Sequence, residues 1–145
     1  TLSLHDALPI LNDGTERYQL RTSPWLYTRL YFIDRKVIFG TAGSDGYLYC
    51  INAEDGSVNW SVFLKNGCAY LDFYHDCVIV GDFEKKIKQI SIDTGDVIQE
   101  IDVGGEVVGD IKVYGDAVYT VAWGNSEKPI RLVKVGLGAK RVICI

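Results

Sequence analysis

Methionine is absent from this 145-residue chain, and several features that would point to a particular class of protein are missing with it. No apolar run approaches the ~18 residues that a membrane-spanning helix needs, so the residues present predict no such span. The formal net charge is only −4, which argues against a nucleic-acid surface built from clustered Lys and Arg. The absence of Met also agrees with an internal segment of a longer protein, so a signal peptide or anchor stays an open question.

Cysteine is present but has no motif spacing. The four cysteines are scattered, with neither a C-x-x-C motif nor an adjacent pair, and they are Cys50, Cys68, Cys77 and Cys144. This spacing gives no support to a zinc site or a thiol redox site. We expect buried small hydrophobic residues at Cys50, Cys77 and Cys144, while a disulfide and the cellular compartment stay undetermined.

The first ten residues, TLSLHDALPI, do not share the pattern of the remaining chain. All ten match the translation of a common sequencing-library adapter, so residues 1–10 are interpreted as non-native. The alternative is a genuine amphipathic N-terminal segment. The fold is therefore predicted from residues 11–145.

Glycine and aromatic residues are plentiful, with 15 Gly, nine Tyr, five Phe and three Trp. One kind of glycine turn recurs at spacings of 42, 39 and 43 residues, at Gly14, Gly56, Gly95 and Gly138. A second marker, a β-branched run, recurs at spacings of 41 and 40 residues, at Val37, Val78 and Val118. Because the two markers keep the same register, the chain is predicted to be a repeat of about 40 residues.

Each repeat contains four short strand-like runs separated by turn residues. In the first full repeat, Asp45-Gly46 and Asp55-Gly56 are strong hairpin signals. Four short strands in about 40 residues is the period of a β-propeller blade. The prediction is an all-β chain of four-stranded antiparallel blades forming an incomplete ring. Residues 15–20 are predicted as the last strand of one blade, followed by blades at about 25–64, 69–102 and 107–145.

The pattern G-x-x-D-G-x-L-Y-x-[ILV]-[DN]-A-x-x-G-x-x-x-W resembles the PQQ-like, or quinoprotein-type, propeller repeat. The best-matching residues are Gly43, Asp45, Gly46, Leu48, Tyr49, Ile51, Asn52, Ala53, Gly56 and Trp60. The resemblance implies a ring of seven or eight blades, whose remaining blades would be partners of this chain. It also implies structural roles for Gly46, Gly56, Trp60 and Gly95, with the Trp packed between blades. Tyr18, Gln99 and Val142 replace that Trp in the other repeats.

Three functions compete: a binding scaffold, a PQQ-dependent dehydrogenase and a solely structural repeat. The resemblance implies that an enzyme would need PQQ, Ca²⁺ and, in many members, an adjacent-cysteine disulfide, which this sequence lacks. Asp72 and Asp110 could face a channel, and Trp25 and Trp123 could stack a cofactor. Ordinary inner-edge and packing roles are preferred for all four. No catalytic residue, metal ligand or bound cofactor is therefore predicted.

Loops on one face are the predicted binding site, because loops that vary on a rigid repeat commonly carry recognition. Links between blades share this face with the turns between second and third strands. Its candidate residues are Arg21, Asp45, Lys65, Asn66, Glu84, Lys85, Asn125 and Glu127. Their mixed charge suits a protein or peptide partner. The lysines at 85, 86 and 88 are interpreted as a solvated hairpin. Cofactor-free members of the resembled family include an outer-membrane assembly scaffold, which favours a periplasmic or extracellular location.

Overall fold

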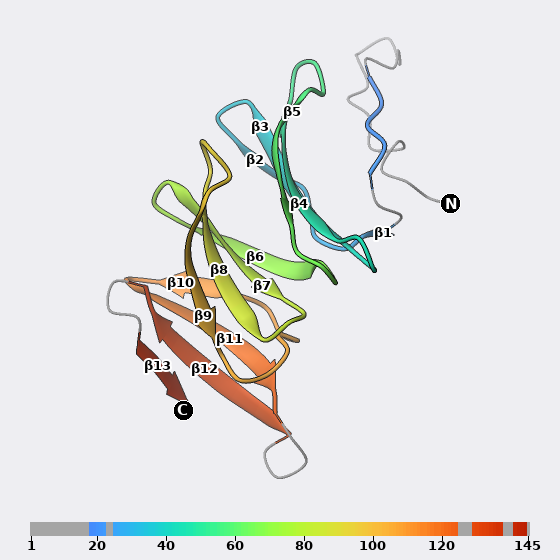
Figure 1. Ribbon diagram of the computed structural model, residues 1–145. Coiled ribbons are helices and arrows are strands. Elements are labelled where there is room, and N and C mark those ends of the chain that lie inside the picture. Colours follow the sequence, from blue (N-terminus) through green and yellow to red (C-terminus); the bar gives the residue numbers. More distant parts are fainter. Residues whose placement is uncertain (1–17, 23–24, 125–128, 138–140, 145) are drawn as a thin grey trace. The chain divides into compact units, whose positions relative to one another are not determined.

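The computed structural model describes residues 18–22, 25–124, 129–137 and 141–144, and these form antiparallel β-sheets (Figure 1). The predicted fold class is therefore confirmed. The chain divides into two compact units, residues 1–67 and 68–145. Among the described residues, no helix has the length and apolar character needed to cross a membrane. Residues 1–10 lie outside the described part.

The first unit contains one sheet in which the strand order is β1-β3-β4-β5 and β2 also pairs with β3. The strands are β1 (Trp25–Leu26), β2 (Tyr31–Ile33), β3 (Lys36–Ala42), β4 (Tyr47–Asn52) and β5 (Val58–Phe63). Val37, Phe39 and Ile51 are buried on one face, where Tyr18 and Leu20 pack against them. Residues 18–20 cover the sheet without forming a strand, so the described part of the predicted 15–20 strand is not one.

The second unit contains two four-stranded sheets, ordered β6-β7-β8-β9 and β10-β11-β12-β13. Their strands are β6 (Cys68–Tyr74), β7 (Cys77–Asp82), β8 (Lys86–Ser91), β9 (Val97–Asp102), β10 (Lys112–Tyr114), β11 (Ala117–Trp123), β12 (Ile130–Gly136) and β13 (Arg141–Cys144). Ile79 and Ile87 from the first sheet join Val118 and Val133 from the second in one buried cluster. Each sheet therefore buries an apolar face against its neighbour, as stacked repeats do.

The first strand of each repeat contains an irregularity at the same repeat position. The N–H groups of residues 27–28 both donate to the carbonyl of Gly40, at 3.2 and 3.3 Å. Those of residues 108–109 donate to the carbonyl of Val121, at 3.0 and 3.2 Å. The β6–β7 register shifts beside Gly81, the equivalent position of the second repeat. Two donors sharing one acceptor insert a bulge, which interrupts the first strand in the first and third repeats.

Glycine is required at the turns for different structural reasons. Gly56 and Gly95 have φ angles of 73° and 77°, which confirms the left-handed conformation expected of both turns. Gly46 has no positive φ, although the β3–β4 hairpin that it was expected to mark is present. A Cβ on Gly46 would instead clash with the backbone of Gly67. Gly46 is thus required for close approach of two chain segments.

An aromatic ring packs against the glycine turn of the following repeat. The Tyr18 ring would clash with a Cβ on Gly56, and its hydroxyl donates a 2.9 Å hydrogen bond to the carbonyl of Ala53. Tyr18 is the aromatic residue four positions after Gly14, as Trp60 is after Gly56. This contact is the kind that the repeat resemblance implied for the aromatic position. Trp60 on β5 is itself buried, with 9% of its surface exposed.

Replacing Gly56 by Val is expected to destabilise the protein by about 1–3 kcal/mol, because Val is strained at positive φ. The new side chain would also displace the Tyr18 ring. Chemical denaturation of both proteins measures this loss. Gly115 provides the control, since its φ is also positive, at 59°, but no atom lies within 4 Å of the point that a Cβ would occupy there. If Gly115→Val costs as much as Gly56→Val, contact with Tyr18 adds nothing.

Candidate functional site

In the first unit, two loops of the predicted binding face are held together by backbone hydrogen bonds. The Gly43 and Gly46 N–H groups donate to the carbonyls of Asn66 and Lys65, at 3.3 and 3.0 Å. The β3–β4 turn therefore lies against the link that follows β5. Asp45, Lys65 and Asn66 are all exposed in these two loops. The structure thus brings three of the predicted residues into one loop pair.

The second unit repeats the arrangement. The Val103 N–H donates to the carbonyl of Lys85 at 2.8 Å, joining the β7–β8 turn to the link after β9. The Trp123 N–H donates to the carbonyl of Glu106 at 2.7 Å, joining the same link to the end of β11. Glu84 is half-buried in this turn and Lys85 is exposed. Three loops of the predicted face therefore meet within this unit.

The remaining predicted residues are not part of these two loop groups. Arg21 is exposed in the stretch before β1, and no contact found in the described part links it to either group. Asn125 and Glu127 lie outside the described residues. The structural residues Gly46, Gly56, Trp60 and Gly95 were considered with the fold. The candidate site thus comprises one loop pair in the first unit and one three-loop group in the second.

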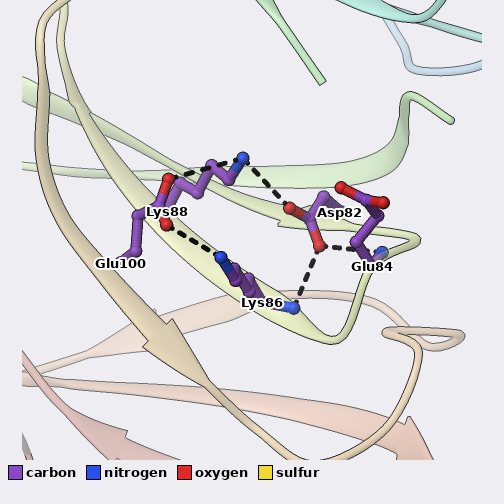
Figure 2. A network of polar contacts seen from close by, with 5 residues as sticks. All are labelled: Asp82, Glu84, Lys86, Lys88 and Glu100. Carbon is purple, nitrogen blue, oxygen red and sulfur yellow. Dashed lines mark hydrogen bonds and ion pairs between the residues drawn. The ribbon is translucent and has the colours of Figure 1, made fainter. Parts of the chain in front are cut away.

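A buried carboxylate holds the backbone of the β7–β8 turn by hydrogen bonds (Figure 2). Asp82 is completely buried, and its Oδ1 accepts hydrogen bonds from the N–H groups of Glu84 and Lys86, both at 2.9 Å. Its Oδ2 has no hydrogen bond of good geometry, but the Lys88 ammonium lies 3.2 Å away as an ion-pair partner. Asp82 thereby fixes the backbone that carries Lys85, whose φ is 74°.

Glu100 on β9 extends the network to two lysines. Its carboxylate oxygens lie 3.1 Å from the Lys86 ammonium and 3.6 Å from the Lys88 ammonium (Figure 2). The hydrogen bond with Glu100 raises the pKa of Lys86, and the same bond lowers the pKa of Glu100.

Burial, followed by the nearby charge of Asp82, raises the pKa of the Cys68 thiol to about 12. Cys68 is therefore protonated at neutral pH and a poor nucleophile.

The lysine cluster is not the solvated hairpin that the sequence suggested. The Lys88 side chain is only 12% exposed and contacts Asp82, so Lys85 alone of the three is exposed without an ion-pair partner among the described residues. Asp82 was missed because an acid ending an apolar strand has no motif of its own. The available signal was an Asp two residues before the turn centre, where its carboxylate caps backbone N–H groups.

The residues considered for cofactor chemistry have other contacts. Asp72 on β6 accepts a 2.7 Å hydrogen bond from the Val113 N–H on β10, so it joins two sheets of the second unit. Asp110 lies 3.4 Å from the Lys112 ammonium. Trp25 and Trp123 are 60% and 55% exposed, so no contact among the described residues buries either side chain. The described residues include no group of three or more His, Cys, Asp or Glu suited to hold a metal ion.

Sequence comparison assigns the chain to a protein family. The family model described as outer membrane protein assembly factor BamB, a PQQ-type repeat model, matches residues 44–135. The chain belongs to this family. The match covers β4 and β5 of the first unit and, in the second unit, β6 to β11 with the three-loop group. No curated protein matches the sequence.

Solved structures with the same fold are distant in sequence. BamB from Moraxella catarrhalis has a TM-score of 0.73 and 16% identity, covering 90% of this chain and 40% of that one. The computationally designed Ika4 protein has a TM-score of 0.72 and 15% identity, over 90% of this chain and 78% of the design. A europium-containing methanol dehydrogenase has a TM-score of 0.68 and 9% identity, over 85% of this chain and 26% of the enzyme. This BamB-family chain thus spans less than half the length of the Moraxella protein.

Proposed function

We propose that the chain is part of a non-catalytic propeller scaffold that binds a protein or peptide partner through the loops of one face. The observation that carries the proposal is the second unit's three-loop group, whose backbone is fixed by hydrogen bonds and by buried Asp82. Exposed Lys85 and Glu106 give this group charges of both signs. Rigid loops with mixed charge suit the polar surface of a protein partner. Membership of a family described as an assembly factor supports this proposal.

The competing proposal is a PQQ-dependent dehydrogenase, which is supported by likeness of fold to a methanol dehydrogenase and to two quinohemoprotein alcohol dehydrogenases. A cofactor sandwich needs a stacking surface and oxygen ligands that converge on one point. Asp72 is engaged with the Val113 N–H, and Asp110 lies beside Lys112. These contacts favour structural roles for both acids, so the scaffold is the better proposal. The expected periplasmic or extracellular location remains a prediction from the family.

Titration of the full-length protein with PQQ and Ca²⁺ is expected to show no binding at micromolar concentration. In parallel, reversing the charges at Lys65, Glu84 and Lys85 should reduce capture of the natural partner, while Lys112→Glu on β10 should leave it unchanged. Calorimetry measures the first result and co-purification the second. Tight PQQ binding that is lost on changing Asp72 or Asp110 would replace the scaffold proposal with the enzyme.

We also propose that a further blade of the same protein covers one face of the β10–β13 sheet. Tyr114, Ile130 and Leu132 share that face by strand register and are between 45% and 80% exposed. Three large exposed apolar side chains on one sheet face are unusual for a surface in contact with water. The equivalent face of the β6–β9 sheet, which includes Ile79, is covered by the neighbouring sheet. We likewise propose that the ranges of about 25–64, 69–102 and 107–145 are successive blades of that protein.

A further inference from the structure

A pocket of about 270 Å³ opens within the three-loop group of the second unit. It lies where the β7–β8 turn, the link after β9 and the end of β11 meet. Its lining residues are Lys85, Gly104, Gly105, Glu106, Trp123 and Gly124. The volume is slightly below the range of about 300–1,000 Å³ typical of sites for drug-sized ligands and cofactors. The pocket therefore suits a single side chain better than a fused-ring cofactor.

Two adjacent glycines form the backbone wall of the pocket, and each is required for a different reason. Gly104 has a φ of 72°, and its N–H donates a 2.7 Å hydrogen bond to Asp102 Oδ1. A Cβ on Gly105 would clash with the carbonyl of Trp123. The point that a Cβ would occupy on Gly104 lies 3.0 Å from the Arg131 guanidinium, so both glycines allow close packing within the protein at this wall. The wall is also rigid, since Glu106 accepts the hydrogen bond from the Trp123 N–H.

The pocket holds two opposite charges that do not pair with each other. Lys86 and Lys88 are neutralised by Asp82 and Glu100, as Figure 2 shows. By contrast, no ion pair or side-chain hydrogen bond involving Lys85 or Glu106 is found in the described part of the chain. Both residues are exposed and line the same pocket. A ligand with one acid and one base could satisfy both without breaking an existing contact.

Trp123 is also among the residues that line the pocket. Trp123 ends β11 and is 55% exposed, although large aromatic side chains are usually well buried. Its backbone N–H donates to the carbonyl of Glu106, which fixes the main chain at the end of β11. Exposed Trp beside well-defined polar groups is a common anchor of protein interfaces, where aromatic residues carry a large share of the binding energy.

We propose that this pocket binds an extended peptide segment in which an apolar or aromatic side chain lies between an acidic and a basic residue. The central side chain packs on Trp123, the ligand carboxylate faces Lys85 and the ligand cation faces Glu106. This inference rests on the proposed binding function and names the chemistry that the partner must present. The negative charge of Glu106 disfavours a polyanion such as a nucleic acid.

The test is an NMR titration of the full-length protein labelled with ¹⁵N at the tryptophan indole. Trp123→Phe assigns the signal of Trp123. Two capped peptides serve as probes, Gly-Glu-Tyr-Lys-Gly and Gly-Lys-Tyr-Glu-Gly, because the direction of the chain in the pocket is free. One of them is expected to shift the Trp123 signal saturably. A neutral Gly-Gln-Tyr-Gln-Gly peptide should bind about four- to 25-fold more weakly, since it loses two exposed ion pairs that each contribute about two- to fivefold.

Charge variants then test the two contacts separately. Lys85→Ala and Glu106→Ala should each weaken the preferred charged peptide by about two- to fivefold. Lys112→Ala and Asp93→Ala, exposed residues outside the pocket, should leave its affinity unchanged. The double reversal Lys85→Glu with Glu106→Lys should change the preference to the peptide of opposite order. A structural role for these two side chains would not produce that exchange.

Three outcomes would overturn the inference: no shift at Trp123, equal affinity for the neutral peptide, or an unchanged preference in the double reversal. Partner capture separates this inference from the proposed function. If Trp123→Phe and Lys85→Ala proteins still capture the partner while no probe peptide binds, the face binds elsewhere and the pocket is not the site. If partner capture fails in the unmodified protein but the peptide exchange is observed, the pocket assignment stands without the scaffold role.

Discussion

Replacing Trp60 by Ala is expected to lower the free energy of unfolding by about 3–5 kcal/mol, the range for removing a buried aromatic side chain. Trp60 lies on β5 opposite Cys50 and is 9% exposed, so nearly all of its surface is withdrawn from water. Removing the ring exposes apolar neighbours and leaves a cavity that a β-sheet cannot easily collapse to fill. Denaturant unfolding followed by circular dichroism of the full-length protein measures the loss.

Gln99 provides the matched control because it occupies the equivalent position on β9. Its side chain is half-buried, and the Nε2 atom is enclosed without a hydrogen-bond partner in the described structure. Because a buried unsatisfied amide is itself unfavourable, Gln99→Ala should cost less than about 1 kcal/mol. Equal losses for Trp60→Ala and Gln99→Ala would show that the aromatic repeat position does not stabilise these sheets.

The repeat and its strands could be predicted because local sequence signals agree with each other. Alternating side chains and glycine turns predicted four short strands in each repeat, and both sheets of the second unit have four strands. Gly56 and Gly95 were predictable because positive φ strongly favours glycine. The first-strand bulges were not, since they depend on which carbonyl a second strand offers. Residues 27–28 have no local signal for sharing the Gly40 carbonyl.

The sequence predicted which loops share a face, but it did not predict how their side chains are arranged there. Strand order alone determines which loops lie together, so Asp45, Lys65 and Asn66 could be grouped before the structure was known. The pocket beside Lys85 depends on tertiary contacts, because Gly105 must press against the Trp123 carbonyl to form it. Sequence also could not separate Lys85 from its neighbours. Only the structure shows that Lys86 and Lys88 are paired with buried or bridging acids.

Replacing Asp82 by Ala is expected to destabilise the second unit by about 2–4 kcal/mol. Breaking a buried ion pair from one side typically costs about 3–5 kcal/mol, and the 12% exposure of the Lys88 side chain reduces that range somewhat. The substitution leaves Lys88 with Glu100 as its remaining acid, at 3.6 Å. It also removes the acceptor of the Glu84 and Lys86 N–H groups in the β7–β8 turn. Thermal and denaturant unfolding measure the effect.

Thr41 is the natural comparison, because it occupies the position equivalent to Asp82 in the preceding repeat. Its Oγ1 accepts a 3.0 Å hydrogen bond from the Tyr47 N–H, so a neutral hydroxyl does the capping there. Thr41→Ala should therefore cost only about 1–2 kcal/mol, the range for losing one hydrogen-bonding cap. Asp82→Asn keeps an acceptor for the turn but loses the charge, and should fall between these two values.

A double substitution separates the charge of Asp82 from its capping role. If the unpaired Lys88 ammonium causes most of the loss, Asp82→Ala with Lys88→Met should be more stable than Asp82→Ala alone by about 1–2 kcal/mol. If capping dominates, the double substitution should recover nothing, while Asp82→Asn should restore most of the stability. In either case the turn that carries Lys85 loosens in Asp82→Ala, so binding at the loop face should weaken even where the protein stays folded. A stable Asp82→Ala protein with unchanged partner capture would mean that the turn holds its shape without the buried carboxylate.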